Sequence, residues 1–296
     1  MSEIDFRRRR LLTAMALSPL AWHLPGASAA SRPDLQRIIA LEWLPTELLL
    51  ALGITPFAIA DIAGYRAWVE SPTLPEGVVD IGLRTEPNLE LMTQLRPSLI
   101  VYSAGYGPAP DKIARIAPGM GITFTDGKHP LDNARRSVLA LGERLGLQAQ
   151  ARRHLNEFEA LITHMRQRFA PWRGKPLLLM TLIDTRHALI IGQNSLFQQT
   201  MSELELQNAW RGDANFWGSA VVGLERLAAV DAARVICFAH NDETLMRQVA
   251  ATPLWQAMPF VREGRFHRTS AVWFYGATPS AMRFCHLLDA ALGAHP

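Results

Sequence analysis

Short apolar runs alternate with helix-like segments along residues 31–147. The runs that predict strands are 37–41, 56–60, 78–81, 99–102 and 122–125, and the segments between them that predict helices are 45–52, 89–95 and 111–116. Strands that alternate with helices in this way are typical of an α/β domain with a mainly parallel sheet. We therefore expect one α/β lobe over residues 31–147.

A different pattern covers residues 131–169, where charges are frequent and proline is absent. From residue 148 the apolar positions recur at intervals of three and four, as on one helix face, and they are Leu155, Phe158, Leu161, Ile162, Met165 and Phe169. About 22 residues, each rising about 1.5 Å, give a rod of roughly 33 Å. We expect a linker helix over residues 148–170, ended by Pro171, that holds the two halves of the chain at a nearly fixed separation.

The α/β alternation resumes after this helix. Strands are predicted at 177–183, 188–191, 234–238 and 265–269, and helices at 224–229, 243–250 and 277–292. The fold class that follows is α/β, with lobes at residues 31–147 and 171–296. Each lobe is expected to hold a mainly parallel sheet, and the long rigid inter-domain helix bridges the two.

The N-terminal segment, residues 1–30, has the layout of a secretory signal peptide. A basic cluster at 7–10 is followed by an apolar stretch at 11–24 and by small residues at 27–30. The apolar stretch is shorter than the roughly 20 residues that span a bilayer, and no later segment reads as a transmembrane helix. Adjacent arginines followed by two leucines favour the twin-arginine route, with an ordinary Sec signal as the alternative. We expect cleavage near Ala29, no lipid anchor, and a mature protein in the periplasm.

Charge and cysteine content narrow the class of protein further. The chain has 30 Lys and Arg against 27 Asp and Glu, and residues 1–30 hold four of the former and two of the latter, so the mature net charge is near +1. That balance argues against a nucleic-acid partner. Cys237 and Cys285 form no CxxC motif, so neither a thiol redox site nor a zinc ribbon is indicated. A disulfide between them and two buried free thiols both stay open.

Motifs of the common enzyme classes are missing from the sequence. It contains no GxSxG elbow, Walker A loop, HExxH motif or GxGxxG after a predicted strand. Its nine histidines include no pair at i, i+4 spacing, so a metal site made of protein side chains is not expected. These observations favour a binding protein over an enzyme.

Large aromatic residues follow several predicted strands, at the sheet edge where open α/β folds bind ligands. They are Trp43, Tyr65, Trp68, Tyr106, Trp217 and the run Trp273, Phe274 and Tyr275, all in predicted loops, and Ser219 closes the polar stretch around Trp217. Tryptophan and tyrosine offer stiff apolar area with one hydrogen-bonding group, which suits an amphipathic ligand. The competing interpretation for any one of them is a loop pinned to the core.

Arg84 is the candidate polar group at the same edge, because it follows the predicted strand 78–81 after two intervening residues. A guanidinium is always charged, and its fork of donors suits anionic oxygens. The alternative is a surface arginine paired with Glu86 or Asp80.

Several stretches resemble class III periplasmic binding proteins. They are residues 37–43 (RIIALEW), 81–90 (IGLRTEPNLE), 95–101 (LRPSLIV) and the closing stretch 252–276. The resemblance spans essentially the whole mature chain and is strongest to the branch that binds iron(III)–hydroxamate siderophores. It implies two α/β lobes bridged by a long helix, a shallow aromatic groove and little lobe closure.

The resemblance also implies roles for individual residues. An arginine and a tyrosine of that branch contact the hydroxamate oxygens on iron, and Arg84 and Tyr106 match them. The groove-wall tryptophans match Trp68, Trp217 and Trp273, with Trp43, Ser219, Phe274 and Tyr275 nearby.

The implied ligand is a siderophore of ferrichrome, coprogen, aerobactin or ferrioxamine type, and the implied partner is an inner-membrane ABC permease. The protein is expected to act as a monomer. Since three hydroxamates fill all six coordination positions of iron(III), the protein needs no metal ligand and no cofactor of its own.

Two competing functions stay open. Within the binding-protein class, the ligand is cobalamin, haem or a catecholate siderophore. A tris-catecholate is strongly anionic and would favour several basic groove residues, whereas the motifs offer one clear arginine. Outside that class, the competitor is a periplasmic enzyme exported by the twin-arginine route.

Acidic residues after two central strands are candidates for the permease contact. Asp111 follows the strand 99–102, and Asp242 and Glu243 follow the strand 234–238, each near the start of a predicted helix. The resemblance implies that one acidic residue on each lobe docks on permease arginines. The same carboxylates would also serve as plain caps that stabilise the helix dipole.

Overall fold

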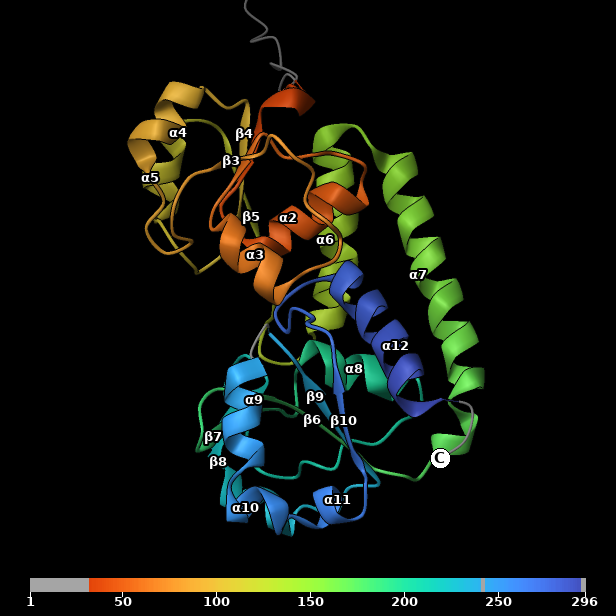
Figure 1. The fold of residues 1–296 in the computed structure, drawn as a ribbon. Coiled ribbons are helices and arrows are strands. Elements are labelled where there is room, and N and C mark those ends of the chain that lie inside the picture. The colour runs from red at the N-terminus through yellow and green to blue at the C-terminus, as the bar shows by residue number, and fades with distance from the viewer. Residues whose placement is uncertain (1–31, 241–242, 294–296) are drawn as a thin grey trace, which may run out of the picture. The chain divides into compact units, whose positions relative to one another are not determined.

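Two five-stranded sheets organise the chain in the computed structural model, which describes residues 32–240 and 243–293 (Figure 1). The first sheet belongs to residues 33–147, which we call the N-lobe, and has the order β3-β2-β1-β4-β5 with parallel neighbours throughout. Its strands are β1 (Ile38–Ala40), β2 (Ala58–Ile59), β3 (Val79–Asp80), β4 (Leu99–Ser103) and β5 (Gly119–Ile122). The predicted signal peptide at 1–30 lies outside the described residues.

Helices pack on both faces of the N-lobe sheet. They are α2 (Trp43–Ala51), α3 (Ile62–Trp68), α4 (Leu89–Leu95) and α5 (Pro110–Ala114), and the 3-10 turn η2 (Leu35–Arg37) precedes β1. Successive residues of β1 face opposite sides: Ile38 packs in the cluster with Leu48 of α2, and Ile39 in the cluster with Met92 of α4. Burial on both faces explains why the central strands read as continuous apolar runs.

The edge strand β5 lies three residues before its predicted position, so the expected strand at 122–125 was wrong. Two glycines of β5 lie against the ring of Tyr102 on β4. A Cβ would lie 3.1 Å from that ring at Gly119 and 3.2 Å from it at Gly121. Close approach of an aromatic ring, which an apolar pattern does not encode, therefore selects this glycine-rich segment as the strand.

Tyr65 and Trp68 lie in helix α3, not in the loop that was expected after residue 60. Asp61 caps the helix by accepting a hydrogen bond from the Gly64 amide at 2.9 Å. The helix has only seven residues, so it shows too little periodicity to be recognised in the sequence.

The second sheet belongs to residues 171–293, which we call the C-lobe, and has the order β10-β9-β6-β7-β8. Its strands are β6 (Leu177–Leu182), β7 (His187–Ile191), β8 (Ser219–Gly223), β9 (Arg234–Phe238) and β10 (Phe266–Thr269). β7 runs antiparallel to β6 and to β8, and the other pairs of this sheet are parallel. Over the described residues six of eight strand pairings are parallel, as expected for the whole fold.

The elements of the C-lobe depart from the sequence prediction in several places. Its helices are α8 (Leu196–Glu203), the 3-10 helix η4 (Leu224–Ala229), α9 (Glu243–Ala250), α10 (Pro253–Gln256), α11 (Pro259–Arg262) and α12 (Thr278–Leu292). Helices α8, α10 and α11 and strand β8 were not predicted, and residues 224–229 form a 3-10 helix rather than an α-helix. Each of these segments is short, so packing outweighs local pattern.

The predicted linker helix is one arm of a helical hairpin. α7 covers Gln148–Arg168, ends two residues before the expected boundary and continues into the turn η3 (Ala170–Trp172). The other arm is α6 (Pro130–Leu145), which ends at Gly146 with a φ of 75°. Glycine adopts this left-handed conformation without strain. The predicted long helix is therefore present as α7, and it packs against a second helix, α6.

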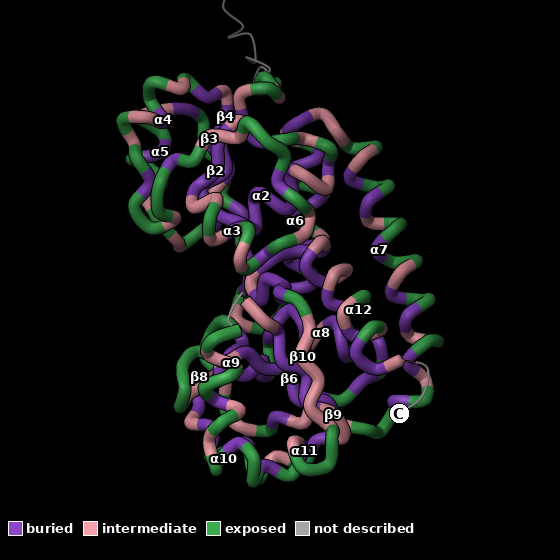
Figure 2. Tube along the Cα trace, in the orientation of Figure 1, coloured by how far each residue is buried: buried purple, intermediate pink, exposed green. Residues whose placement is uncertain are grey.

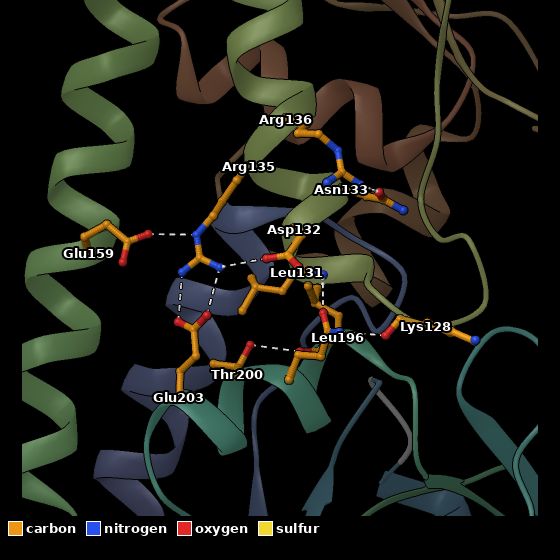
Figure 3. Close-up of polar contacts among 11 residues, drawn as sticks. Lys128, Leu131, Asp132, Asn133, Arg135, Arg136, Glu159, Leu196, Thr200 and Glu203 are labelled. Carbon is orange, nitrogen blue, oxygen red and sulfur yellow. Dashed lines mark hydrogen bonds and ion pairs between the residues drawn. The ribbon is translucent and has the colours of Figure 1, made fainter.

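Hydrogen bonds and ion pairs connect this hairpin to α8 of the C-lobe (Figure 3). Arg135 of α6 donates to both carboxylate oxygens of Glu203 on α8 at 2.8 Å and to Glu159 of α7 at 2.7 Å. Gln199 of α8 accepts a hydrogen bond from the amide of Leu131 at 2.7 Å. Because a bidentate arginine–carboxylate pair defines distance and orientation, α6 and α8 hold the lobes together in addition to α7.

One apolar cluster continues from the N-lobe into the C-lobe. Helix α12 packs on α2, α7 and α8, and its Phe284 stacks on Phe197 of α8 with ring centroids 4.3 Å apart. Buried residues recur along α7 and α12 (Figure 2). The chain from Pro33 onward therefore folds as one compact unit.

Both cysteines are buried free thiols, and burial raises the pKa of each to about 12. None of the helices in the described part of the chain is long and apolar enough to cross a membrane.

Candidate functional site

A groove of about 330 Å³ lies at the carboxyl edge of the N-lobe sheet and is closed on its other side by the C-lobe. The residues that line it are Glu42, Arg84, Ser103, Ala104, Tyr106 and Phe124 from the N-lobe, and Trp217, Trp273 and Tyr275 from the C-lobe. The N-lobe residues lie at or just beyond the carboxyl ends of β1, β3, β4 and β5, which meet at one edge because these strands are parallel.

Arg84 points into this groove and is held from two sides. Its Nη1 donates to Glu42 Oε1 at 2.8 Å, and its Nε lies 3.8 Å from Asp61 Oδ2. The guanidinium carbon lies 3.5 Å from the ring centroid of Trp43 and 5.1 Å from that of Trp273. The alternative that Arg84 is a surface residue paired with Glu86 or Asp80 is therefore wrong.

Glu42, which sequence reasoning missed, organises the polar end of the groove. It is buried and caps α2 by accepting a hydrogen bond from the Leu44 amide at 2.8 Å. The same carboxylate accepts from Ser103 Oγ at 3.0 Å and pairs with Arg84. An acidic residue between a strand and a helix start was a detectable capping signal, but its ion pair with Arg84 was not.

Tyr106 lines the groove beside Arg84, with the guanidinium carbon 5.5 Å from the Tyr106 ring centroid. Its loop approaches the backbone of Arg84, and a Cβ on Gly107 would lie 2.8 Å from the Arg84 carbonyl oxygen. Gly107 also has a φ of 76°, so only glycine suits this position. The local backbone thus brings together the two residues that were expected to meet the ligand's polar centre.

Trp217 and Tyr275 form the far wall of the groove, on the C-lobe side, whereas Ser219, another candidate ligand-binding residue, is buried and is not among the lining residues. The hydroxyls of Ser219 and Tyr275 lie 3.0 Å apart, and Ser219 Oγ also donates to Asn215 Oδ1 at 3.3 Å. Asn215 Oδ1 further accepts the amide of Trp217 at 2.9 Å, so one side chain orients this turn. Burial raises the pKa of Tyr275, which therefore stays a neutral hydrogen-bonding phenol.

Phe124, which was also missed, joins the two lobes at this wall. Its ring stacks on that of Trp217 with centroids 6.0 Å apart and meets the Tyr275 ring edge-on at 5.8 Å. The strand predicted at 122–125 would contain Phe124. In the structure Phe124 follows β5 and lines the groove.

Trp43, Trp68 and Phe274 are not among the groove-lining residues. Trp43 is buried behind Trp273, and the two rings meet edge-on with centroids 4.6 Å apart. Phe274 is 3% exposed and packs on Phe238 in the core. Phe274 and Tyr275 form a turn, in which Trp273 and Tyr275 line the groove while Phe274 packs into the core. The expectation that Phe274 contacts the ligand is therefore not supported by its position.

Trp68 lies next to the groove and lines a second, smaller pocket of about 160 Å³. Its ring stacks on His240 of the C-lobe with centroids 4.0 Å apart and meets Trp273 edge-on at 6.3 Å. Thr181 donates to the Phe238 carbonyl and lies 3.0 Å from His240 Nδ1. Trp68 is thus part of a row of rings that crosses from one lobe to the other.

Tyr65, by contrast, is a core residue whose hydroxyl donates to the Pro72 carbonyl at 2.6 Å.

Two of the candidate docking residues, Asp111 and Glu243, are exposed. Asp111 is the second residue of α5 and lies 3.7 Å from Arg115. Glu243 begins α9 and pairs with Arg268 at 2.5 Å. Asp242 lies outside the described residues. Ala109 is the N-cap of α5, so Asp111 is not a capping residue in the strict sense and acts locally only on the helix dipole.

The described residues contain no cluster of side chains that could bind a metal ion. No group of three or more His, Cys, Asp or Glu side chains there is placed to hold an ion. His129 pairs with Asp126 and His187 with Asp184, each within a surface turn.

Known proteins resemble this chain in sequence and in fold. The model of the periplasmic binding protein family matches residues 38–272. The chain is 57% identical over 286 residues to the iron(3+)-hydroxamate-binding protein FhuD of Escherichia coli K12, covering 97% of this chain and 96% of that protein. It is 31% identical to the achromobactin-binding periplasmic protein of Dickeya dadantii, over 92% of this chain and 89% of that one.

A solved structure supports the fold. The Fe3+–Desferal-bound siderophore-binding protein FhuD from Vibrio cholerae matches with a TM-score of 0.81 at 28% identity, over 89% of this chain and all of that chain. The expected fold class, two α/β lobes with mainly parallel sheets and a long helix between them, is confirmed.

Proposed function

Because the chain belongs to the periplasmic binding protein family, we propose that it captures an iron(III)–hydroxamate siderophore in the periplasm and delivers it to an inner-membrane ABC permease. The observation that carries this proposal is the position of Arg84. Its guanidinium is oriented by Glu42 at the junction of the polar N-lobe edge and the aromatic C-lobe wall. The 57% identity to an iron(3+)-hydroxamate-binding protein supports the same ligand class.

The chemistry of the groove suits a chelate whose metal is already satisfied. Three hydroxamates occupy all six positions of iron(III), so the ligand presents oxygens rather than an open metal. A guanidinium carries five N–H donors, more than the Glu42 contact uses, and the Tyr106 hydroxyl adds one more. The protein then needs no metal ligand and no cofactor.

The size of the groove favours recognition of the iron centre over the siderophore backbone. A volume of about 330 Å³ is at the lower end of the range of ligand sites, which runs from about 300 to 1,000 Å³. A large siderophore would therefore seat its iron centre between Arg84 and the aromatic wall and leave part of its backbone in solvent. Such a site would accept hydroxamates with different backbones.

The charge of the groove bears on the competing ligands. Arg84 is the one basic residue among those that line the groove in the described structure, and Glu42 lies beside it. A tris-catecholate complex carries a large negative charge and would gain little from a guanidinium that is already paired. A near-neutral ferric hydroxamate suits this balance better.

We further propose that the protein acts as a monomer and presents Asp111 and the Asp242–Glu243 pair to the permease.

The test is a titration of the purified protein with a panel of ligands, in which tryptophan fluorescence reports binding. Ferric ferrichrome, coprogen, aerobactin and ferrioxamine should quench fluorescence and bind, whereas their iron-free forms should bind far more weakly. Ferric catecholate, haem and cobalamin serve as the competing ligands. Equal affinity for iron-free siderophore, or tighter binding of a competing ligand, would overturn the proposal.

A further inference from the structure

Helix α2 of the N-lobe places a buried carboxyl group at the start of the last C-lobe helix. Glu47 has no exposed surface, and its Oε2 accepts a hydrogen bond from the Ala277 amide at 3.0 Å. Its Oε1 accepts a second hydrogen bond from the hydroxyl of Ser280. Ala277 is the N-cap residue of α12 and has no side chain that could cap the helix itself. A residue of one lobe therefore supplies the cap for a helix of the other.

This cap lies two residues beyond the groove wall. Tyr275 lines the groove, Gly276 follows it, and Ala277 is the residue that Glu47 holds. A Cβ on Gly276 would lie 2.5 Å from Glu47 Oε2, so the contact requires glycine there. The other end of the same segment is held by Arg283, whose Nε donates to the Ala271 carbonyl at 2.7 Å. Hydrogen bonds therefore fix both ends of this segment, and the one from Glu47 comes from the N-lobe.

The same helix also positions the polar side of the groove. Trp43 lies one turn before Glu47 on α2 and contacts both Arg84 and Trp273. Glu42, which caps α2, pairs with Arg84. Helix α2 therefore contacts the guanidinium and Trp273 through Trp43, and the segment that follows Tyr275 through Glu47.

We propose that Glu47 is a positioning residue for ligand capture, which sets the distance between Trp273 and Tyr275 of the C-lobe and Arg84 of the N-lobe. The inference rests on the proposed function, because it assigns Glu47 a role in the same groove. Glu47 does not touch the ligand. It acts by fixing the position of Trp273 and Tyr275 relative to the guanidinium. A ligand that must contact both sides at once depends on that spacing.

The test compares Glu47→Ala with Glu47→Gln in the full mature protein, using ferric ferrichrome as the probe in isothermal titration calorimetry. Removing the acceptor should weaken binding about tenfold, within the range seen for residues that act at a distance. Glutamine keeps an acceptor for the Ala277 amide and a polar partner for Ser280, so its affinity should stay within about twofold of the wild type.

The matched control is Asn208→Ala. Asn208 is buried, donates to the Ile191 carbonyl and accepts from the Trp210 amide, and it lies outside the groove. Its loss leaves buried backbone groups unpaired, as Glu47→Ala does, but leaves the wall in place. A protein that is merely less stable shows a lower stoichiometry with an unchanged Kd. A displaced wall shows full stoichiometry with a raised Kd.

Three results would overturn the role of Glu47: wild-type Kd in Glu47→Ala, equal weakening in Glu47→Gln and Glu47→Ala, or equal weakening in Asn208→Ala. If Glu47→Ala does not fold, Ser280→Ala removes one of the two contacts. It should weaken binding about threefold, and a wild-type Kd there would overturn the inference. Absence of binding by the wild-type protein itself would overturn the proposed function, which is a separate outcome.

Discussion

Glu42 and Arg84 are 42 positions apart in the sequence, yet their side chains form an ion pair with an N–O distance of 2.8 Å at the floor of the groove. Glu42 follows β1 and Arg84 follows β3, and β2 lies between these strands in the sheet. The pair therefore exists because parallel strands deliver their following residues to one edge. It leaves the guanidinium anchored on one side and available to a ligand on the other.

Arg84→Lys should weaken the binding of every ferric hydroxamate even though the charge is kept. An ammonium cannot reproduce the forked donors or the stacking on Trp43. Loss of a charge-assisted contact costs about 1.5–3 kcal/mol of binding free energy, measured as a change in Kd. Arg226→Lys is the control, because Arg226 also lies over a tryptophan, Trp210, but not in the groove. Unchanged affinity in Arg84→Lys would place the ligand elsewhere.

Glu42→Ala should lower both stability and affinity. The substitution removes the cap of α2 and leaves Arg84, in a half-buried site, with only the longer contact to Asp61. Breaking such a pair costs on the order of 3 kcal/mol in the free energy of unfolding, which denaturant titration would measure. Glu86→Ala, at an exposed neighbour of Arg84, is the control and should leave both quantities unchanged. A wild-type unfolding midpoint in Glu42→Ala would show that the pair contributes nothing to stability.

Stability should depend on pH through Glu47. Burial raises the pKa of Glu47 from 4.5 to about 8. Between these values the folded protein holds a proton that the unfolded chain releases, so the free energy of unfolding falls as pH rises from about 4.5 to 8. Glu47→Gln cannot ionise and should lack this decline. The difference between the two proteins should change by up to a few kcal/mol over this range.

The measurement is denaturant unfolding of both proteins at a series of pH values. His154, whose pKa is lowered by burial, produces the opposite trend, with stability lost as pH falls. It is present in both proteins and cancels in the difference. Parallel stability profiles for the wild type and Glu47→Gln would contradict the raised pKa.

Charge reversal at the candidate docking residues should separate binding from transport. Asp111→Lys, and Asp242→Lys combined with Glu243→Lys, should leave siderophore affinity intact while iron uptake through the permease falls. Two linked contacts gain from effective concentration, so loss of either should cost far more than a rim charge normally does. Glu263→Lys, beyond α11 in the C-lobe, is the control. Uptake at wild-type rates in both variants would direct attention to Glu90 and Glu225, which are also exposed.

Local pattern was sufficient for most of the fold. Apolar runs located nine of the ten strands found in the described residues, although the position of β5 was wrong. The spacing of apolar residues located α7 to within two residues. The same reasoning placed Arg84, Tyr106 and Trp273 at the sheet edge, because residues that follow parallel strands share that edge whatever their partners are. Trp217 instead precedes β8, which is antiparallel to β7. These features depend on short stretches of chain, which a single sequence records directly.

The partners within the site were decided by the tertiary structure alone. Phe124 faces the groove only because glycines shift β5, and Phe274 turns into the core only because Trp273 and Tyr275 occupy the other side. Glu47 meets Ala277 across 230 positions of sequence, through the packing of α12 on α2. Contacts of this kind depend on strand order and helix packing over the whole chain, so no local pattern of residues contains them.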